Sequence, residues 1–212
     1  MTEVQEWFEK LRVERTIKAL KKNNFEAQFV EKAAHAVREI FDMIPDGATV
    51  GVGGSMTLTQ IGFFDEASKH SITLLNPTPH PSIDDFLRMR REIFLADVFV
   101  SSSNAVTEDG KLCNIDGSGN RIGAMTFGPK KVILVCGVNK IVKDIDEAMK
   151  RVQNWAAPMN AKRLGLKTPC AETGVCSDCR SPQRICNTYV VTAKRPTWTQ
   201  VTVLLVGEPL GL

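Results

Sequence analysis

The sequence predicts an α/β domain built on a Rossmann-like, mostly parallel sheet with helices on both faces, followed by a small C-terminal cysteine lobe. Two observations lead to this fold class. Segments with helical spacing of apolar residues alternate along the chain with short β-rich runs, which is typical of parallel strands joined by crossover helices. The run at 131–136 is apolar throughout, which indicates a strand buried on both faces.

The elements follow from these patterns in chain order. An apolar stripe predicts a helix over 3–22, and the segment 25–30 is expected to be extended. Further helices are expected over 31–43, about 58–69, 82–96 and 144–163. Strands are expected over 49–52, 71–75, 98–101, 131–136, 188–193 and 199–206.

These elements divide the chain into four parts. We expect an N-terminal helix at 1–22, an α/β core at 23–165, a cysteine lobe at 166–187 and strands at 188–212 that complete the core. The N-terminal helix carries two large aromatic residues, Trp7 and Phe8, in its apolar stripe. Because such a stripe has to be covered by the core or by a partner, a homodimer is expected.

Bulk composition excludes several classes of protein. The 212 residues are 43% hydrophobic and 24% charged, which is ordinary for a globular protein. The net charge of +3 is too small to indicate nucleic-acid binding. No apolar run approaches the ~20 residues needed to span a bilayer. The first ten residues are acidic and amphipathic rather than a signal segment, so a cytoplasmic location is expected.

Four of the six cysteines lie within 17 residues, at Cys170, Cys176, Cys179 and Cys186. The C-x2-C step allows one turn to present two thiolates to the same metal centre, and the surrounding prolines and glycine favour such a turn. Disulfides or free thiols are the alternatives, but nothing indicates an oxidising compartment. A single close pair is less typical of structural zinc than of an iron–sulfur cluster. We therefore expect a [4Fe–4S] cluster, with zinc as the alternative.

Two loops are candidates for binding a ligand. The first, at 51–57, is a glycine turn between a strand and a helix, where backbone N–H groups and hydroxyls attract anions. The second, at 104–121, follows another strand and is dense in carboxylates, amides and glycines around a tight turn at Asp109 and Gly110. His80, in a proline-rich link after a strand, is a weaker candidate. No nucleophilic triad is recognisable.

Three runs carry a resemblance to a known family: GVGGSMTLTQIG at 51–62, NAVTEDGKLCNIDGSGNR at 104–121 and FGPKKVILVCGVNK at 127–140. Together they resemble the LUD domain family of lactate-utilisation proteins over about residues 10–210. The resemblance implies the fold of ribose-5-phosphate isomerase, glucosamine-6-phosphate deaminase and the CoA transferases. The acidic residue of the isomerases is missing at 103–105, so isomerisation of a sugar phosphate is not expected.

The resemblance also implies the residues that face a small anionic organic acid, or a ligand of the phosphate or CoA type. They are Gly51, Gly53, Gly54, Ser55, Thr57, Asn104, Glu108, Asp116, Gly117, Asn120 and Arg121. The two loops are expected side by side at one edge of the sheet, with Arg121 binding the anion. The resemblance implies a role in iron–sulfur-dependent oxidation of lactate or a related acid, as a subunit or accessory protein beside iron–sulfur partners. The alternative is a transferase, isomerase or cyclo-ligase acting on a phosphorylated or CoA-bearing molecule, with a purely structural cysteine quartet.

Overall fold

The computed structural model describes residues 2–76 and 82–212 and contains two sheets within them. The larger sheet has six strands in the order β1-β10-β7-β4-β2-β3, and every neighbouring pair is parallel. Its strands are β1 Glu26–Val30, β2 Thr49–Val52, β3 Thr73–Leu75, β4 Val98–Ser101, β7 Lys131–Gly137 and β10 Gln200–Val206. The predicted fold class is confirmed, including the apolar central strand at 131–136.

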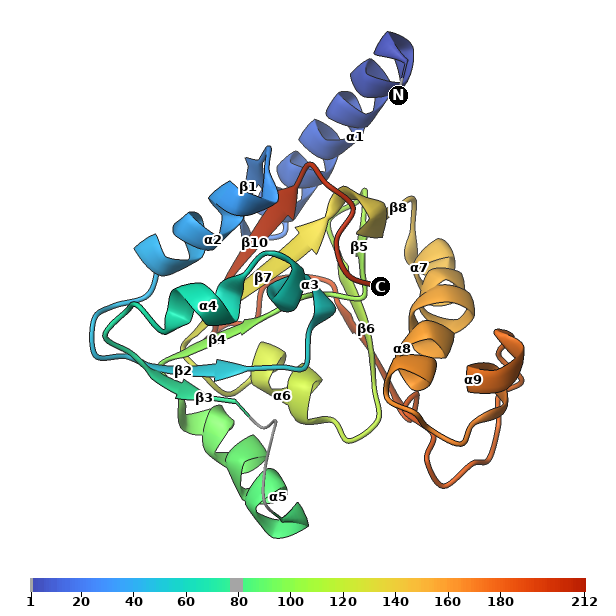
Figure 1. Cartoon of the computed structure of the whole chain (residues 1–212). Helices are drawn as coiled ribbons and strands as arrows, with labels where there is room; N and C mark the ends of the chain where they lie inside the picture. Colours follow the sequence, from blue (N-terminus) through green and yellow to red (C-terminus); the bar gives the residue numbers. More distant parts are fainter. Residues whose placement is uncertain (1, 77–81) are drawn as a thin grey trace.

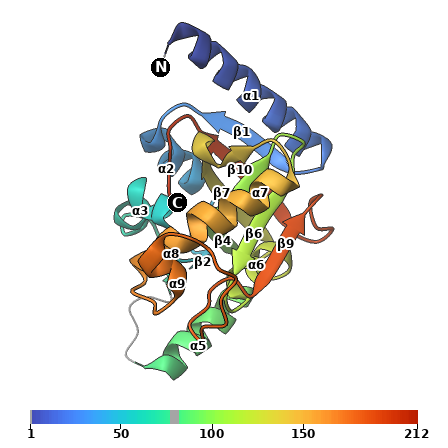
Figure 2. The same ribbon diagram turned by 90° about the vertical axis from the view of Figure 1, so that its right-hand side faces the viewer.

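Helices cover both faces of this sheet (Figure 1). One face packs against α2 Ala33–Asp42, α3 Met56–Gln60 and α4 Phe63–Ala67. The other packs against α1 Glu3–Lys22 and α6 Asn120–Thr126. Alternate residues of a strand serve the two faces: Val98 and Val100 join the first core, and Phe99 joins the second. The first turns of α1 extend beyond the sheet (Figure 2).

A second sheet of four strands lies beside the first, in the order β8-β5-β6-β9. Its strands are β5 Ala105–Thr107, β6 Leu112–Asp116, β8 Ile141–Val142 and β9 Thr188–Thr192. The predicted turn at Asp109 and Gly110 joins β5 to β6 as an antiparallel hairpin, and Gly110 has the positive φ of 81° that this turn requires. Of the C-terminal strands, only β10 enters the parallel sheet, because β9 pairs with β6.

Two predicted helices are interrupted. The helix expected at about 58–69 is split into α3 and α4 by Gly62, whose φ of 76° is left-handed. The helix expected at 144–163 is a continuous rod of three parts: α7 Ile145–Arg151, a π-helical turn at Val152–Ala156 and α8 Ala157–Arg163. Pro158, in the first turn of α8, is placed where its missing N–H is best tolerated.

Four shorter elements remain within the described residues. They are α5 Ile83–Glu92, a 3-10 turn at Ile93–Leu95, a 3-10 turn at Val138–Lys140 and α9 Pro169–Thr173. The α5 helix begins at Ser82, whose hydroxyl accepts from the backbone N–H of Asp85 at 3.1 Å, as the capping pattern predicted. None of the helices described is long and apolar enough to cross a membrane.

Candidate ligand pocket and cysteine lobe

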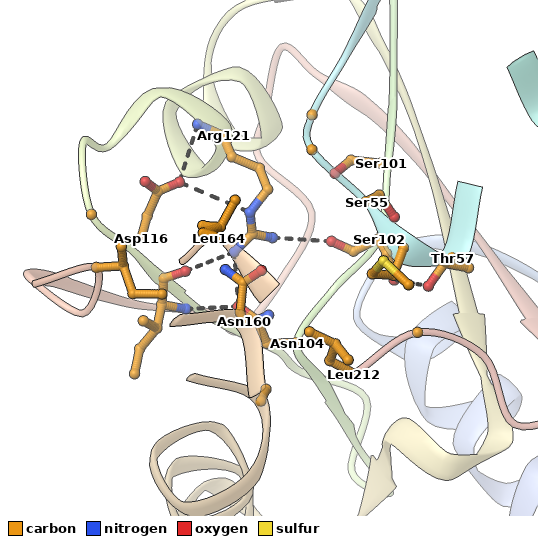
Figure 3. A pocket seen from close by; sticks show the side chains of 18 of the residues that line it. Ser55, Thr57, Ser101, Ser102, Asn104, Asp116, Arg121, Asn160, Leu164 and Leu212 are labelled. Carbon is orange, nitrogen blue, oxygen red and sulfur yellow. Dashed lines mark hydrogen bonds and ion pairs between the residues drawn. The ribbon is translucent and has the colours of Figure 1, made fainter. Parts of the chain in front are cut away.

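A pocket of about 520 Å³ opens where three parallel strands end (Figure 3). Its walls come from the loop after β2, the segment 101–104 after β4, and Lys140 after β7. The π-helical turn, α8 and Ile185 complete it. The carboxyl edge of an open parallel sheet is where α/β proteins bind ligands. The two predicted loops therefore meet in one place.

Gly53 is the position where the two loops touch. A Cβ atom at Gly53 would lie 2.9 Å from the Ser101 hydroxyl and 3.3 Å from the aliphatic stem of Arg121. At Gly54, by contrast, a Cβ would meet nothing within 4 Å. Gly51 has a packing role instead, because its missing side chain makes room for Ile93 at 2.7 Å, and it does not line the pocket.

The hydroxyls of the first loop line the pocket as expected. Ser55 and Thr57 both lie on its wall, together with Gly53 and Gly54. The Ser55 hydroxyl also caps α3, accepting from the backbone N–H of Leu58 at 3.3 Å. Thr57 is buried, and its Oγ1 lies 3.5 Å from the hydroxyl of Ser102 in the loop after β4.

Arg121 is at the pocket wall, and its two Nη atoms already donate to four acceptors of the protein. Its Nη1 donates to the Ser102 carbonyl at 3.0 Å and to Asn114 Oδ1 at 2.7 Å. Its Nη2 donates to Asn104 Oδ1 at 2.7 Å and to the Ile115 carbonyl at 2.8 Å. Burial lowers the pKa of the guanidinium. The Arg121 guanidinium therefore joins the segment 102–104 after β4 to β6, and its predicted role in binding an anion stays a prediction (Figure 3).

Asp116 and Asn104 also serve the fold. The Asp116 carboxylate accepts from four backbone N–H groups, those of Ser118, Gly119, Arg121 and Ile122, at 3.0–3.3 Å, and so caps α6. The Asn104 amide oxygen accepts from the Ile115 backbone as well as from Arg121. Both residues line the pocket, as do Gly117 and Asn120, but the carboxylate has no free oxygen to offer a ligand.

Glu108 lies outside the pocket. Its carboxylate pairs with Arg12 Nε at 3.2 Å and with Arg15 Nη2 at 3.1 Å, so it ties α1 to the β5–β6 hairpin. The sequence placed Glu108 in the ligand loop because it lies near Asp116 in the chain. The hairpin instead carries it to the opposite end of the small sheet. His80, the weaker candidate from the sequence, lies outside the described residues.

Lys140 is the site residue that the sequence analysis missed. Its side chain is buried, with the residue only 4% exposed, and Nζ donates to Ser102 Oγ at 2.7 Å and to Thr57 Oγ1 at 3.1 Å. Its pKa is lowered to about 8, mainly by burial; Cys136 opposes the shift, and the charges of Arg151 and Arg121 add to it. A lysine placed directly after a buried central strand was the signal that could have revealed it.

Two buried polar atoms of the pocket lining lack a partner within the described residues. Ser101 Oγ is fully buried and unpaired, and Arg90 Nε is also unpaired. Both side chains line the pocket. Because a buried polar atom without a hydrogen bond costs about 1–3 kcal/mol, such atoms mark places where a ligand or water completes the site.

The cysteine lobe is built around Arg184. Its guanidinium donates to the Cys179 carbonyl at 2.7 Å and the Cys186 carbonyl at 3.2 Å, and it pairs with Asp178 at 2.7 Å. Asp178, inside the C-x2-C step, has the left-handed φ of 47° expected of a tight turn. All four cysteines of the quartet are free and partly exposed.

The quartet has the donor chemistry of a metal site, and its thiols are close enough to influence one another. Burial raises the pKa of the Cys186 thiol, and the nearby thiols of Cys176, Cys179 and Cys170 raise it further, although Arg184 opposes them. Among the described residues, however, no three side chains of the ligand types already stand in a metal-holding arrangement. The four thiols lie in one lobe, but their sulfur atoms do not yet form a coordination sphere.

The lobe also forms a wall of the pocket. Ile185, next to Cys186, lines the pocket and lies 3.0 Å from where a Cβ of Gly117 would be. Asn187 donates to the Asp116 carbonyl at 3.1 Å through its backbone and to the Gly117 carbonyl at 3.0 Å through its side chain. The cysteines and the ligand loops are therefore parts of one structural unit.

Comparison with known proteins identifies the family of this chain and a solved structure with a similar fold. The sequence pattern of the LUD domain matches residues 13–206. The chain belongs to the LUD domain family. The fold of this LUD protein is similar to the crystal structure of a DUF162 family protein from Deinococcus radiodurans, with a TM-score of 0.54, 15% identity, and coverage of 94% of this chain and 98% of the other. Among curated proteins, no match to this LUD protein was found.

Proposed function

We propose that this LUD protein binds a small anionic organic acid in the pocket and takes part, as a subunit or accessory protein, in iron–sulfur-dependent oxidation of lactate or a related acid. The observation that carries the proposal is Lys140, a buried ammonium whose hydrogen-bond partners are two neutral hydroxyls. A buried charge without a counter-ion is costly, so the site is suited to receive an anion.

The charge balance of the pocket supports an anionic ligand. Its described lining includes four cationic side chains and one carboxylate, and that carboxylate is fully engaged with backbone N–H groups. The cations are Arg90, Arg121, Lys140 and Arg163. Ser101 Oγ adds an unpaired hydroxyl at the same wall. A carboxylate or phosphate would satisfy these donors through charge-assisted hydrogen bonds.

Ligand binding can be tested with a pair of glycine variants. Thermal unfolding and calorimetry should be measured with L-lactate and, separately, with inorganic phosphate. Gly53→Val should abolish binding, because its side chain would occupy the space between Ser101 and Arg121. Gly54→Ala, in the same loop but facing open space, is the matched control and should retain binding. Equal binding by both variants would contradict the proposed pocket.

The iron–sulfur part of the proposal concerns Cys170, Cys176, Cys179 and Cys186, which would hold a [4Fe–4S] cluster, or alternatively zinc. Their thiol chemistry and their grouping around Arg184 support it. When bound, such a cluster supplies one-electron transfer. Anaerobic purification followed by metal analysis and an absorption spectrum tests the assignment. Iron with sulfide would support a cluster, and zinc would support the structural alternative. A protein that contains no metal would contradict both assignments.

A second candidate is favoured by the size of the pocket. A volume of about 520 Å³ exceeds what a three-carbon acid fills, and Arg90 and Arg163 also lie along its wall. Such a site suits a transferase, isomerase or cyclo-ligase acting on a phosphorylated or CoA-bearing molecule. Stabilisation by CoA or by a sugar phosphate, without stabilisation by lactate, would favour this alternative.

We also propose that the exposed end of α1 pairs with a second copy or docks on an iron–sulfur partner protein. Trp7 is 59% exposed and Phe8 is 50% exposed, on turns that extend beyond the sheet (Figure 2). Light scattering of the purified protein and of a Trp7→Glu, Phe8→Glu variant tests the homodimer. A monomeric mass for the wild-type protein would contradict the homodimer and favour docking of this surface on a different protein.

A further inference from the structure

Lys140 has features that binding alone does not require. An ammonium group has three N–H donors, and two of those on Lys140 are taken by Ser102 and Thr57. Because Lys140 lines the pocket, its third N–H is available to a ligand there. Its hydrogen-bond partners are hydroxyls, which can donate or accept a proton, rather than a carboxylate that would hold the amine permanently charged.

The surroundings of Lys140 favour loss of its proton. The side chain is buried, and the guanidinium groups of Arg121 and Arg151 add repulsion, against the opposing influence of Cys136. Asp116, the one acidic side chain in the described pocket lining, is committed to four backbone N–H groups. Desolvation and neighbouring cations are the two means by which proteins turn a lysine into a nucleophile.

We propose that Lys140 Nζ is a catalytic nucleophile that condenses with the carbonyl carbon of a 2-oxo acid bound in the pocket. This inference rests on the proposed function, because it uses the same anion pocket and adds the substrate class. The ligand's carboxylate would be held by the pocket's cations and by the unpaired hydroxyl of Ser101, which is fully buried. That hydroxyl is an observation independent of the lysine.

The reaction balances without a further reagent. The neutral amine forms a bond to the carbonyl carbon, and the carbonyl oxygen takes up a proton to give a carbinolamine. Loss of that oxygen as water leaves an iminium linkage, so the sum of the protonated lysine and the ketone equals the iminium ion and one water molecule. The hydroxyls of Ser102 and Thr57, at 2.7 Å and 3.1 Å from Nζ, are placed to relay the protons.

Borohydride trapping tests the proposal on the full-length protein. The protein is incubated with pyruvate and sodium borohydride, which delivers hydride to an iminium carbon and makes the linkage permanent, and the modified lysine is located by peptide mass spectrometry. L-lactate, which has no carbonyl to condense, is the matched ligand control. We expect Lys140 to carry at least about tenfold more label than the exposed Lys143, since its free amine is far more abundant near neutral pH.

Two further measurements distinguish covalent trapping at Lys140 from anion binding in the pocket. Lys140→Arg has no primary amine to condense, so it should lose the label at residue 140. Trapping in the wild-type protein should rise with pH around 8, in accord with the lowered pKa of Lys140 beside Arg121, Arg151 and Cys136. Equal labelling of Lys140 and Lys143, or a rise only above pH 10, would overturn the proposal. Lactate binding without trapping would overturn it while leaving the proposed pocket intact.

Discussion

The ligand pocket and the cysteine lobe lie side by side, and each is organised around one arginine. Arg121 in the pocket has four protein acceptors within 3.0 Å, and these come from the segment 102–104 and from β6. Arg184 in the lobe also reaches carbonyl oxygens, but those belong to the lobe itself, and its ion-pair partner Asp178 is largely exposed. The first arrangement fixes distant segments to each other, and the second orders only a short loop.

The difference indicates how each region obtains its final geometry. The pocket is complete without a ligand, because buried hydrogen bonds determine the position of its walls. The lobe has partly exposed thiols and few buried apolar residues: within α9, only Ala171 is buried. We therefore expect its stability to depend on what the thiols bind, as in small metal-stabilised loops. The predictions below test this contrast, beginning with the largest expected effect.

Replacing Arg121 should cause the largest loss of stability. Arg121→Ala removes four charge-assisted hydrogen bonds: those to the carbonyls of Ser102 and Ile115, and those to the amide oxygens of Asn104 and Asn114, which each keep one backbone donor. Because each buried unpaired group costs about 1–3 kcal/mol, the free energy of unfolding should fall by at least about 3 kcal/mol. Urea denaturation measures it. A change of less than 1 kcal/mol would remove the basis for calling the pocket preorganised.

Replacing Lys140 should change stability in the opposite direction. The folded pKa of about 8 lies below the ordinary 10.5, so the unfolded chain binds more protons between these values and wild-type stability rises with pH across that window. Lys140→Met should therefore raise the free energy of unfolding by up to about 3 kcal/mol at pH 7. The gain should shrink from pH 8 to 10.5. A pH-independent difference would show that the lysine is not desolvated.

Arg184→Ala should have a much smaller effect than the matching change at Arg121. Its ion pair with Asp178 is near the surface, and such pairs contribute about 1 kcal/mol or less. Global unfolding should change within that range, while amide hydrogen exchange should increase only over 165–187. If Arg184→Ala destabilised the whole domain as strongly as Arg121→Ala, the lobe would have to be counted as part of the core.

Changing Cys176 and Cys179 together to Ser should leave the sheet almost unaffected. We expect loss of bound metal, greater exchange over 165–187, and a change of no more than about 0.5 kcal/mol in the unfolding of the sheet domain. Cys113→Ala is the control for a cysteine outside the quartet, because Cys113 is buried in the small-sheet core. That control should retain the metal and lower core stability instead.

The parallel sheet could be predicted because its signal is local. The glycine turn after 49–52 and the apolar strand at 131–136 each indicate their own element, and the carboxyl ends of parallel strands necessarily share an edge. The roles of individual side chains could not be predicted in this way. Arg121 and Asp116 looked like ligand-binding groups by residue type, but long-range hydrogen bonds to Asn104, Ser102 and the α6 backbone use up their capacity.

Glu108 and Lys140 also show that the sequence does not reveal the role of a single side chain: Glu108 was predicted in the site and lies outside it, and Lys140 was not predicted and lies in it. Glu108 lies in the most family-specific run, but the β5–β6 hairpin carries it away to Arg12 and Arg15. Lys140 ends another of these runs, at 127–140, but it was not among the predicted ligand residues, and only the fold shows that its side chain is buried beside Thr57 and Ser102. Periodicity reports which residues form a strand. It does not report which polar group is left without a partner, because that depends on contacts between distant segments.

The position of β10 in the sheet has a consequence for how the chain folds. β10 lies between β1 and β7, and among the described strands β1 pairs with β10 alone. The partners Glu26 and Thr202 are far apart in sequence, so an emerging chain cannot close this side of the sheet until residues 200–206 have been made. Until then, β1 has an exposed edge that can pair wrongly. Late closure of this kind predicts slow folding and a need for protection of the nascent chain.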